Sequence, residues 1–404
     1  MSARARTHAA GTAPALTPIP ERLLLGAGPS PVPRSVLDAL AEPTIGHLDP
    51  VFVQVMEETA ALLRTAFDTA NPATLPLSTT GSGGMDALVV NFIEPGDRVV
   101  CGVNGLFGER MADALTRAGA ELVRVEAPWG RALAVEDLLA AAEPGLRAMV
   151  VIHGETSTGV CQPLDGLAAA CREREALLLV DCVTSLSGQP LSIDGDGVDA
   201  AFSGTQKCLN CPPGLSPFTA GPRALERLGA RAQPPRSWYL DLSLVGAYWV
   251  GPTDPDAAPR PRTYHHTAPV NLIYGLREAL RLVVEEGLAA RWRRHRRAHE
   301  ALRQALGVFG FERLAPAEEA LAPLLALRVP DGLDEADLRA RLLREHGIEV
   351  SGGLGPLAGQ IWRIGVMGVG ARPDPQRRLV QALADVLGGG AGEALSALQA
   401  GWEQ

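Results

Sequence analysis

Short apolar runs alternate with stretches of helical periodicity in the first half of the chain. The runs predict strands at 98–101, 121–125, 148–152, 177–180 and 200–202, and the stretches between them predict helices at 85–91, 109–118, 135–142 and 164–173. Continuous apolar strands joined by helices are typical of a parallel sheet that helices cover on both faces. Because ligands of such sheets bind beyond the carboxyl ends of the strands, the loops after these strands are the places to look for chemistry.

The pattern changes near residue 275. It then predicts helices at 273–285, 288–306, 335–344 and 375–387, and strands at 324–329 and 361–366. After the glycine break at 388–390 we expect only a short tail. The N-terminal residues are small, Pro-rich and free of acids, which favours a disordered arm over a transit peptide. We therefore predict a flexible arm (1–21), a large domain (22–285) and a smaller α+β domain (286–404).

Composition narrows the class of protein. The 404 residues are 46% apolar and 21% charged, which is typical of a globular chain with a sizeable core. The net charge of −9 argues against a nucleic-acid partner, and no run of 18 apolar residues predicts a membrane-spanning helix. The six cysteines do not form the framework of a small secreted protein, so we interpret them as reduced thiols of a cytoplasmic protein.

One lysine stands out among the charged residues. Of the 37 basic residues, Lys207 is the only lysine and the rest are arginines. Arginine replaces lysine at many surface positions, but only lysine loses its proton readily and acts as an amine nucleophile. The sequence therefore indicates that the amine of Lys207 is chemically required.

Two further features suit a lysine that carries pyridoxal phosphate. Asp181 ends a predicted strand, where a carboxylate can hold the pyridine nitrogen of this cofactor protonated. The segment Thr79–Gly84 is rich in glycine and precedes a predicted helix, as a phosphate-binding turn does. The segment is neither a P-loop nor a Gly-x-Gly-x-x-Gly fingerprint, so ATP and NAD lose their main support. Taken alone, each of the two features is also compatible with an ordinary turn.

With these residues in place, the chain resembles the class V, fold-type I aminotransferases of the alanine–glyoxylate and serine–pyruvate group, over residues 22–387. The resemblance rests on nine short stretches in order: LLLGAGPSPVP (23–33), GHLDP (46–50), TTGSGGMDA (79–87), NGLFGER (104–110), HGETSTG (153–159), VDCVTSLSGQPL (180–191), SGTQKCLNCPPG (203–214), YHHTAPV (264–270) and SGGLGPLAGQIWRIGVMG (351–368).

The resemblance implies the fold, the cofactor and the site. The fold is a large domain with a mostly parallel sheet plus a smaller α+β domain, and the cofactor is pyridoxal 5′-phosphate. Lys207 would carry it as a Schiff base, Asp181 would pair with its ring nitrogen, and Ser157 would lie near its ring hydroxyl. The implied cofactor-binding residues are Ser82, Gly83, Gly84, Phe107, Ser157, Asp181, Val183, Gln206, Lys207, Tyr264 and Thr267.

The resemblance also implies substrates and a partner. Arg363 would bind the substrate carboxylate, with Ala27 and Ser157 beside it, and Tyr264 and Thr267 would reach the phosphate of a second subunit. The implied activity is ping-pong transfer of an amino group from alanine or serine to glyoxylate or pyruvate, in a homodimer with shared active sites. A ureidoglycine- or pyridoxamine-type transaminase, a β-lyase or desulfurase, and a non-enzymatic scaffold remain alternatives.

Some positions depart from the family pattern. Phe107 stands where tryptophan is frequent, Gly84 replaces a bulkier residue, and Ala27 replaces a proline. We expect Gly84 to enlarge the phosphate end, and an insert occupies about 252–262.

Two further groups of residues invite a functional interpretation. Cys208 and Cys211 have C-x-x-C spacing, but they follow the lysine directly, and we expect neither redox nor metal chemistry from them. On the predicted helix at 288–306, we expect His295, His299 and the arginines at 291–297 to form a solvated face.

Overall fold

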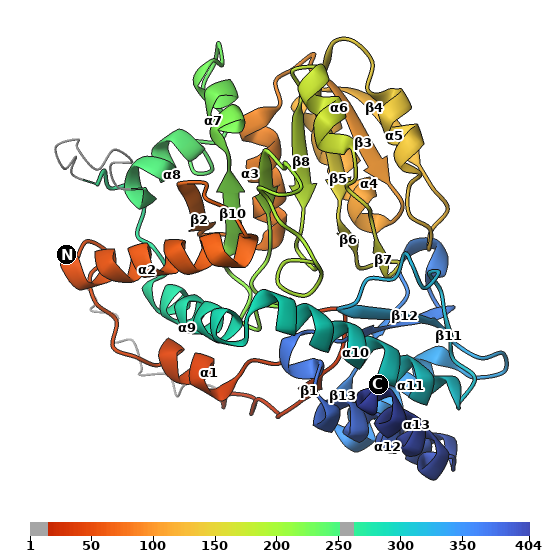
Figure 1. Ribbon diagram of the computed structural model, residues 1–404. Helices are drawn as coiled ribbons and strands as arrows, with labels where there is room; N and C mark the ends of the chain where they lie inside the picture. Colours follow the sequence, from red (N-terminus) through yellow and green to blue (C-terminus); the bar gives the residue numbers. More distant parts are fainter. Residues whose placement is uncertain (1–14, 251–261) are drawn as a thin grey trace, which may run out of the picture.

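The computed structural model describes residues 15–250 and 262–404 (Figure 1). The expected N-terminal arm and the insert therefore lie largely outside the described residues. Two sheets organise the chain, a seven-stranded one and a four-stranded one, and Figure 1 shows helices α9 and α10 running from the first toward the second. This α/β architecture confirms the predicted fold class.

The seven-stranded sheet carries the order β2-β10-β9-β8-β5-β3-β4. Its strands are β2 (Ala73–Leu77), β3 (Arg98–Val103), β4 (Glu121–Glu126), β5 (Leu146–Ile152), β8 (Leu177–Asp181), β9 (Ala200–Phe202) and β10 (Ser216–Ala220). Strand β10 runs antiparallel to both of its neighbours, and the remaining pairs are parallel. Six strands therefore point the same way, and their carboxyl ends share one edge of the sheet.

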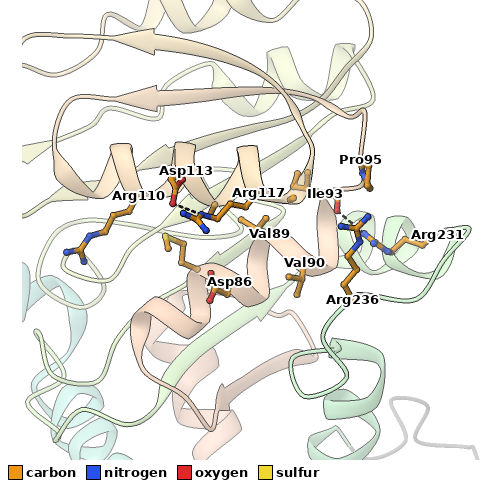
Figure 2. Close-up of a pocket in the computed structure, with 13 residues that line it drawn as sticks. Asp86, Val89, Val90, Ile93, Pro95, Arg110, Asp113, Arg117, Arg231 and Arg236 are labelled. Carbon is orange, nitrogen blue, oxygen red and sulfur yellow. Dashed lines mark hydrogen bonds and ion pairs between the residues drawn. The ribbon is translucent and has the colours of Figure 1, made fainter.

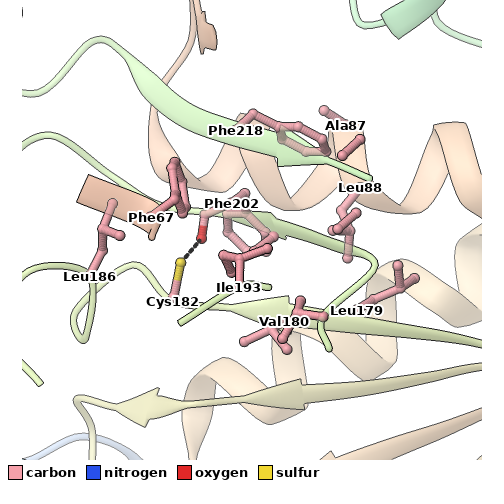
Figure 3. Packing of buried hydrophobic residues seen from close by; sticks show 14 of the residues in the cluster. Phe67, Ala87, Leu88, Leu179, Val180, Cys182, Leu186, Ile193, Phe202 and Phe218 are labelled. Atoms are coloured by element: carbon pink, nitrogen blue, oxygen red, sulfur yellow. Dashed lines mark hydrogen bonds between the residues drawn. The ribbon is translucent and has the colours of Figure 1, made fainter. Parts of the chain in front are cut away.

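Helices flank this sheet and seal its core. They are α1 (Arg34–Leu40), α2 (Pro50–Phe67), α3 (Gly81–Phe92), α4 (Leu106–Ala118), α5 (Val135–Ala141), α6 (Leu167–Glu173), α7 (Pro222–Gly229), α8 (Leu242–Trp249) and α9 (Val270–Glu286). Figure 3 shows Ala87 and Leu88 of α3 packed in one cluster with Phe202 of β9 and Phe218 of β10. Buried apolar side chains of this kind dominate the stability of the domain, so α3 is anchored firmly beneath its N-terminal turn.

A short hairpin projects from the end of β5. It consists of β6 (Gly154–Glu155) and β7 (Val160–Cys161), and both residues of β6 are buried. The hairpin turns the chain at the carboxyl edge of the sheet, where the predicted site residue Ser157 lies.

The four-stranded sheet forms a second core. Its order is β11 (Glu312–Arg313), β12 (Leu324–Arg328), β15 (Ile361–Gly365) and β14 (Ser351–Gly352), all antiparallel. Around it lie α10 (Leu288–Gly307), α11 (Glu335–His346), α12 (Pro373–Leu387) and α13 (Ala391–Glu403). Strand β1 (Leu23–Leu24) pairs with β13 (Ile348–Glu349), and Leu25 is buried in the same core. The domain limits at 22–285 and 286–404 stay a prediction.

The C-terminal tail is a helix, which corrects the sequence expectation. Helix α13 buries Ala394 and Leu398, and a Cβ added to Gly401 would lie 2.5 Å from Cα of Ala301 in α10. The close approach of two helices explains the result, because small residues pack the pair without a conspicuous apolar run. Within the described ranges, no helix is long and apolar enough to cross a membrane.

Candidate active site

The carboxyl edge of the large sheet collects most of the predicted site residues. Asp181 is the last residue of β8, and Lys207 follows β9. Phe107 lies in the first turn of α4 after β3, and Ser157 lies in the hairpin after β5. The glycine-rich segment at 79–84 joins β2 to α3. Parallel strands thus bring together residues that are far apart in the sequence.

Lys207 is almost completely buried, and its surroundings favour the neutral amine. Burial and, to a smaller extent, the positive charge of Arg363 lower the pKa of Lys207 to about 8. The amine donates a hydrogen bond to the carbonyl oxygen of Ala27. The next residue, Gly28, has φ +112°, and a Cβ there would lie 2.7 Å from Nζ. Only glycine lets this loop pass so close to the lysine.

Asp181 is a buried carboxylate with few hydrogen-bond donors. Its Oδ1 accepts a hydrogen bond of 2.8 Å from the backbone N–H of Val183. Burial and, to a smaller extent, the negative charge of Glu155 raise the pKa of Asp181 to about 7. A cationic N–H group next to this carboxylate would offset the cost of burying it, as a protonated pyridine nitrogen does.

The N-terminus of α3 is open. Among the described residues no side-chain oxygen caps it, and its first turn carries Gly81, Ser82 and Gly83. Free N–H groups and the helix dipole make such a terminus a binding site for phosphate. Nearby, the side-chain oxygen Oε1 of Gln206 is buried without a partner in the described chain. Turning this amide would present its NH2 group to an anion.

The space beside Gly84 is already filled, contrary to expectation. A Cβ at Gly84 would overlap the hydroxyl of Ser216 and lie 3.0 Å from the ring of Phe202. The glycine therefore does not enlarge the phosphate end, because neighbouring side chains occupy the volume of the missing one. Val183 lies between two other glycines of this region, where a Cβ at Gly81 or Gly204 would be 3.4 Å from its methyl groups.

Arg363 projects from β15 of the small sheet and is also buried. Its Nε donates to the carbonyl oxygen of Gly352 at 2.8 Å, and one terminal nitrogen donates to that of Thr156 at 3.3 Å. These bonds leave the second terminal nitrogen for another acceptor. The charge of Arg363 acts on Lys207, so the residue predicted to bind a carboxylate stands on the lysine side of the site.

Two predicted residues stand apart from this group. Tyr264 is 54% exposed, and Thr267 is exposed beside it. The hydroxyl of Tyr264 lies 3.4 Å from that of Thr267, and its ring lies 5.2 Å from the ring of His47. Within the described subunit, no hydrogen bond joins either residue to Lys207 or Asp181. Both are accessible to a second molecule.

The predicted solvated face of α10 is only partly right, because Arg293, Arg296 and Arg297 are exposed whereas other residues of the group are not. Arg291, His295 and His299 are buried. Arg291 donates to the carbonyl oxygen of Cys208, next to the lysine, and pairs with Glu286 at 2.7 Å. His295 accepts a 2.9 Å hydrogen bond from the N–H of Gly368. Backbone groups of other elements take the place of water as hydrogen-bond partners on this face. The helical pattern of the sequence does not reveal these partners.

Glu155 escaped the sequence analysis. It is the third residue of the HGETSTG stretch, and the sequence pattern around a single acid gives no sign that the acid is buried. The structure places it beneath Phe107 and Ser157 with no exposed surface. Its charge also acts on Lys207 and Asp181. It is therefore part of the site's electrostatics.

A separate surface cavity of about 400 Å³ lies between α3 and α4 (Figure 2). Apolar side chains such as Val89 and Val90 line it, together with Arg110, Arg231 and Arg236. The guanidinium of Arg110 also lies 5.1 Å from the centre of the Phe107 ring. None of the predicted site residues lines this cavity.

Comparison with known proteins places the chain among aminotransferases. Residues 22–357 match the family model "Aminotransferase class-V". The alanine–glyoxylate aminotransferase of Callithrix jacchus is 39% identical, over 91% of this chain and 88% of the relative. That of Drosophila melanogaster is 38% identical, over 87% of this chain and 89% of the relative.

Solved structures agree with the sequence comparison. An alanine–glyoxylate aminotransferase from Nostoc sp. superposes with a TM-score of 0.88 at 45% identity, covering 93% of this chain and 98% of the other. A ureidoglycine–glyoxylate aminotransferase from Bacillus subtilis superposes with a TM-score of 0.90 at 34% identity, covering 96% and 100%.

Proposed function

The chain belongs to the class V aminotransferases, and from this premise we propose that it transfers the amino group of alanine or serine to glyoxylate or pyruvate with pyridoxal phosphate as cofactor. The observation that carries the proposal is the assembly, in one buried site, of the chain's sole lysine with Asp181 and Arg363. An amine, a carboxylate for a ring nitrogen and a cation for a substrate carboxylate are the groups that this reaction needs.

The residues present fit the cofactor. The open N-terminus of α3 offers N–H groups for a phosphate, and Asp181 offers a buried carboxylate for a protonated ring nitrogen. Val183 and Phe107 supply apolar surface for the ring. When bound, pyridoxal phosphate supplies an aldehyde for the lysine amine and a ring that draws electrons from the amino acid.

Each side chain then has a defined task. The lowered pKa of Lys207 gives its Nζ a larger neutral fraction than that of an exposed lysine, so Nζ acts first as nucleophile and later as the base that moves the Cα proton. Asp181 holds the proton on the ring nitrogen. Arg363 binds the substrate carboxylate with its free N–H groups and orients Cα toward Nζ.

Cysteine-based alternatives find no support in the site. Cys208 and Cys211 adjoin the lysine, but both are buried, and burial raises the pKa of each to about 12. A desulfurase needs a reactive, mobile thiolate, and a buried thiol with a raised pKa does not supply one.

We also propose a homodimer with shared sites and a cytoplasmic location. Tyr264 and Thr267 are exposed in one subunit, which suits residues that complete the phosphate site of a second copy. All six cysteines are free thiols, as a reducing compartment favours.

The visible absorption spectrum of the purified protein tests the proposal. With added pyridoxal phosphate we expect the absorption band of the Schiff base that the cofactor forms with Lys207, distinct from that of the free cofactor. Lys207→Arg should abolish this band, because arginine keeps the charge but is no nucleophile. One of L-alanine, L-serine or glycine should bleach the band, and glyoxylate or pyruvate should restore it. A band that no small amino acid bleaches would overturn the substrate assignment, and no band at all would overturn the cofactor assignment.

A further inference from the structure

A carboxylate is buried behind the active site, at the N-terminus of α4. Oε2 of Glu155 accepts hydrogen bonds from the backbone N–H groups of Phe107 at 3.0 Å and Gly108 at 3.2 Å. Oε1 accepts from the backbone N–H of Ser157 at 2.9 Å and from its hydroxyl at 2.6 Å. The side chain thus meets four donors, which is about the full accepting capacity of an ionised carboxylate.

The neighbours of Glu155 define its charge state. Three of the four partners are backbone N–H groups, which can only donate, so these contacts suit a carboxylate that accepts at both oxygens. Burial raises the pKa of Glu155, and its hydrogen bonds to Ser157, Gly108 and Phe107 offset only part of this rise. The dipole of α4 and the nearby cations Lys207 and Arg363 also favour the anion. The hydrogen-bond geometry thus favours the anionic form of Glu155, against the effect of burial.

The same hydrogen bonds fix the hydroxyl of Ser157. It gives its only proton to Glu155 and accepts one hydrogen bond of 2.9 Å from the N–H of Leu106. One lone pair is left, so Ser157 faces the site as an acceptor only. The first three N–H groups of α4 are thereby all bound to Glu155 and Ser157.

The backbone is shaped around this carboxylate. Gly105 precedes α4, and a Cβ there would overlap Cγ and Cδ of Glu155 and lie 2.5 Å from the hydroxyl of Ser157. A side chain at position 105 would push the carboxylate away from the helix end. The glycine is a second, independent sign that the structure is built to seat an anion at this point.

We propose that Glu155 is a positioning residue of the active site, a resident anion that closes the N-terminus of α4 and thereby fixes the Phe107 ring and the accepting hydroxyl of Ser157 toward the cofactor. This inference rests on the proposed function, because Phe107 and Ser157 matter in this way only if they face pyridoxal phosphate. The anion also raises the pKa of Asp181 and of Lys207, so it adjusts both groups of the reaction.

The apoprotein allows a direct test, because Lys207 is the only lysine side chain available to an amine-selective reagent. We would follow the pH dependence of its labelling by peptide mass spectrometry. Glu155→Gln keeps the shape and removes the charge, so the midpoint should move to lower pH. Glu109 is a partly exposed acid in the first turn of α4, and Glu109→Gln should leave the midpoint unchanged.

Hydrogen exchange measures the positioning itself. In Glu155→Gln the amides of Phe107, Gly108 and Ser157 should lose protection, because glutamine offers one accepting oxygen where the carboxylate offers two. If this variant does not fold, Glu155→Asp keeps the charge but withdraws it from the helix. That variant should lose the same protection while the labelling midpoint stays near its original pH.

The loaded protein supplies the last readout. In Glu155→Gln, kcat should fall roughly 10-fold to 100-fold with little change in KM, and adding Ser157→Ala should cost little more because the two residues act as a unit. Unchanged labelling and unchanged exchange in Glu155→Gln would overturn the inference. Both apoprotein readouts are independent of turnover, so failure of the proposed amino donors would not be mistaken for failure of the Glu155 assignment.

Discussion

Helices α3 and α4 begin at the same edge of one sheet, after β2 and β3, yet their N-termini are completed in different ways. The first turn of α3 has no side-chain cap among the described residues. The first turn of α4 is covered by Glu155 and Ser157. Both helix ends attract negative charge through free N–H groups and the helix dipole.

The difference shows how a single edge keeps two anion sites apart. At α4 the protein supplies the anion itself, and the terminus becomes a rigid support for an aromatic ring. At α3 no side chain of the described chain supplies an anion, and we propose that the phosphate of the cofactor fills this place. Asp181, on a strand between β2 and β3 in the sheet order, stands between the two cases, since one backbone N–H donates to it rather than four groups.

Closing the open terminus should have the largest effect. In Ser82→Asp, a carboxylate enters the first turn of α3, where it repels a phosphate and replaces it as the cap. We expect the affinity for pyridoxal phosphate to fall about 1,000-fold, while the apoprotein gains roughly 0.3–1 kcal/mol of stability. Equilibrium titration and thermal unfolding measure the two effects. Ser82→Asn is the neutral control, and an affinity loss as large in that variant would contradict the charge argument.

Removing the incompletely paired charge should change the pH dependence of apoprotein stability. The pKa of Asp181 is raised from its ordinary value of 3.8 to about 7 in the folded protein, so the wild-type apoprotein loses stability as the pH rises between these values. Asp181→Asn lacks this loss and should be more stable than wild type by a few kcal/mol above pH 7, with no advantage below about pH 4. Urea unfolding across the pH range measures this. Asp113→Asn, at the surface, should show no such trend.

Disturbing the closed terminus should have a smaller effect, confined to stability and ring placement. Gly105→Ala forces the side chain of Glu155 aside and should cost about 1–3 kcal/mol of unfolding free energy. Gly246→Ala is the matched control, because a Cβ there meets nothing within 4 Å inside α8, and it should stabilise the protein slightly. Equal unfolding midpoints for the two variants would show that the fit around Glu155 is unimportant.

Inorganic phosphate should produce the smallest effect. It can bind at α3 but finds α4 occupied, so at about ten times its dissociation constant it should stabilise the apoprotein by about 1.4 kcal/mol. Ser82→Asp should abolish this gain, and Glu155→Gln should preserve it. Differential scanning fluorimetry at constant ionic strength is sufficient. A gain that survives Ser82→Asp would place the phosphate elsewhere.

Sequence alone predicted the parts of the molecule that leave a periodic or compositional mark. The apolar runs at 148–152 and 177–180 lie within β5 and β8, and the solitary Lys207 marked the loop after β9. Strand β10 was missed because Ser216–Ala220 begins with a serine and a proline and has no apolar run. Its burial comes from neighbours on both sides rather than from its own composition.

Buried polar groups set the other limit. Glu155, Arg291 and His295 look like surface residues in the sequence, and their partners are mostly backbone groups of distant elements. A one-dimensional pattern carries no record of a carbonyl or an N–H. Such residues become visible only when the fold has brought donor and acceptor together.

The contacts of helix α10 bear on when, during translation, the protein can bind its cofactor. Arg291 donates to the carbonyl oxygen of Cys208 beside Lys207, and Arg294, one turn later, donates to that of Gly368 at 2.7 Å. During translation, Lys207 is incorporated about eighty residues before helix α10, whose arginines contact the lysine's surroundings. We expect a nascent chain to acquire its cofactor only after α10 and the segment at 368 have left the ribosome. The yellow colour of bound cofactor would then indicate that the small domain has been synthesised, and not only that the large domain has folded.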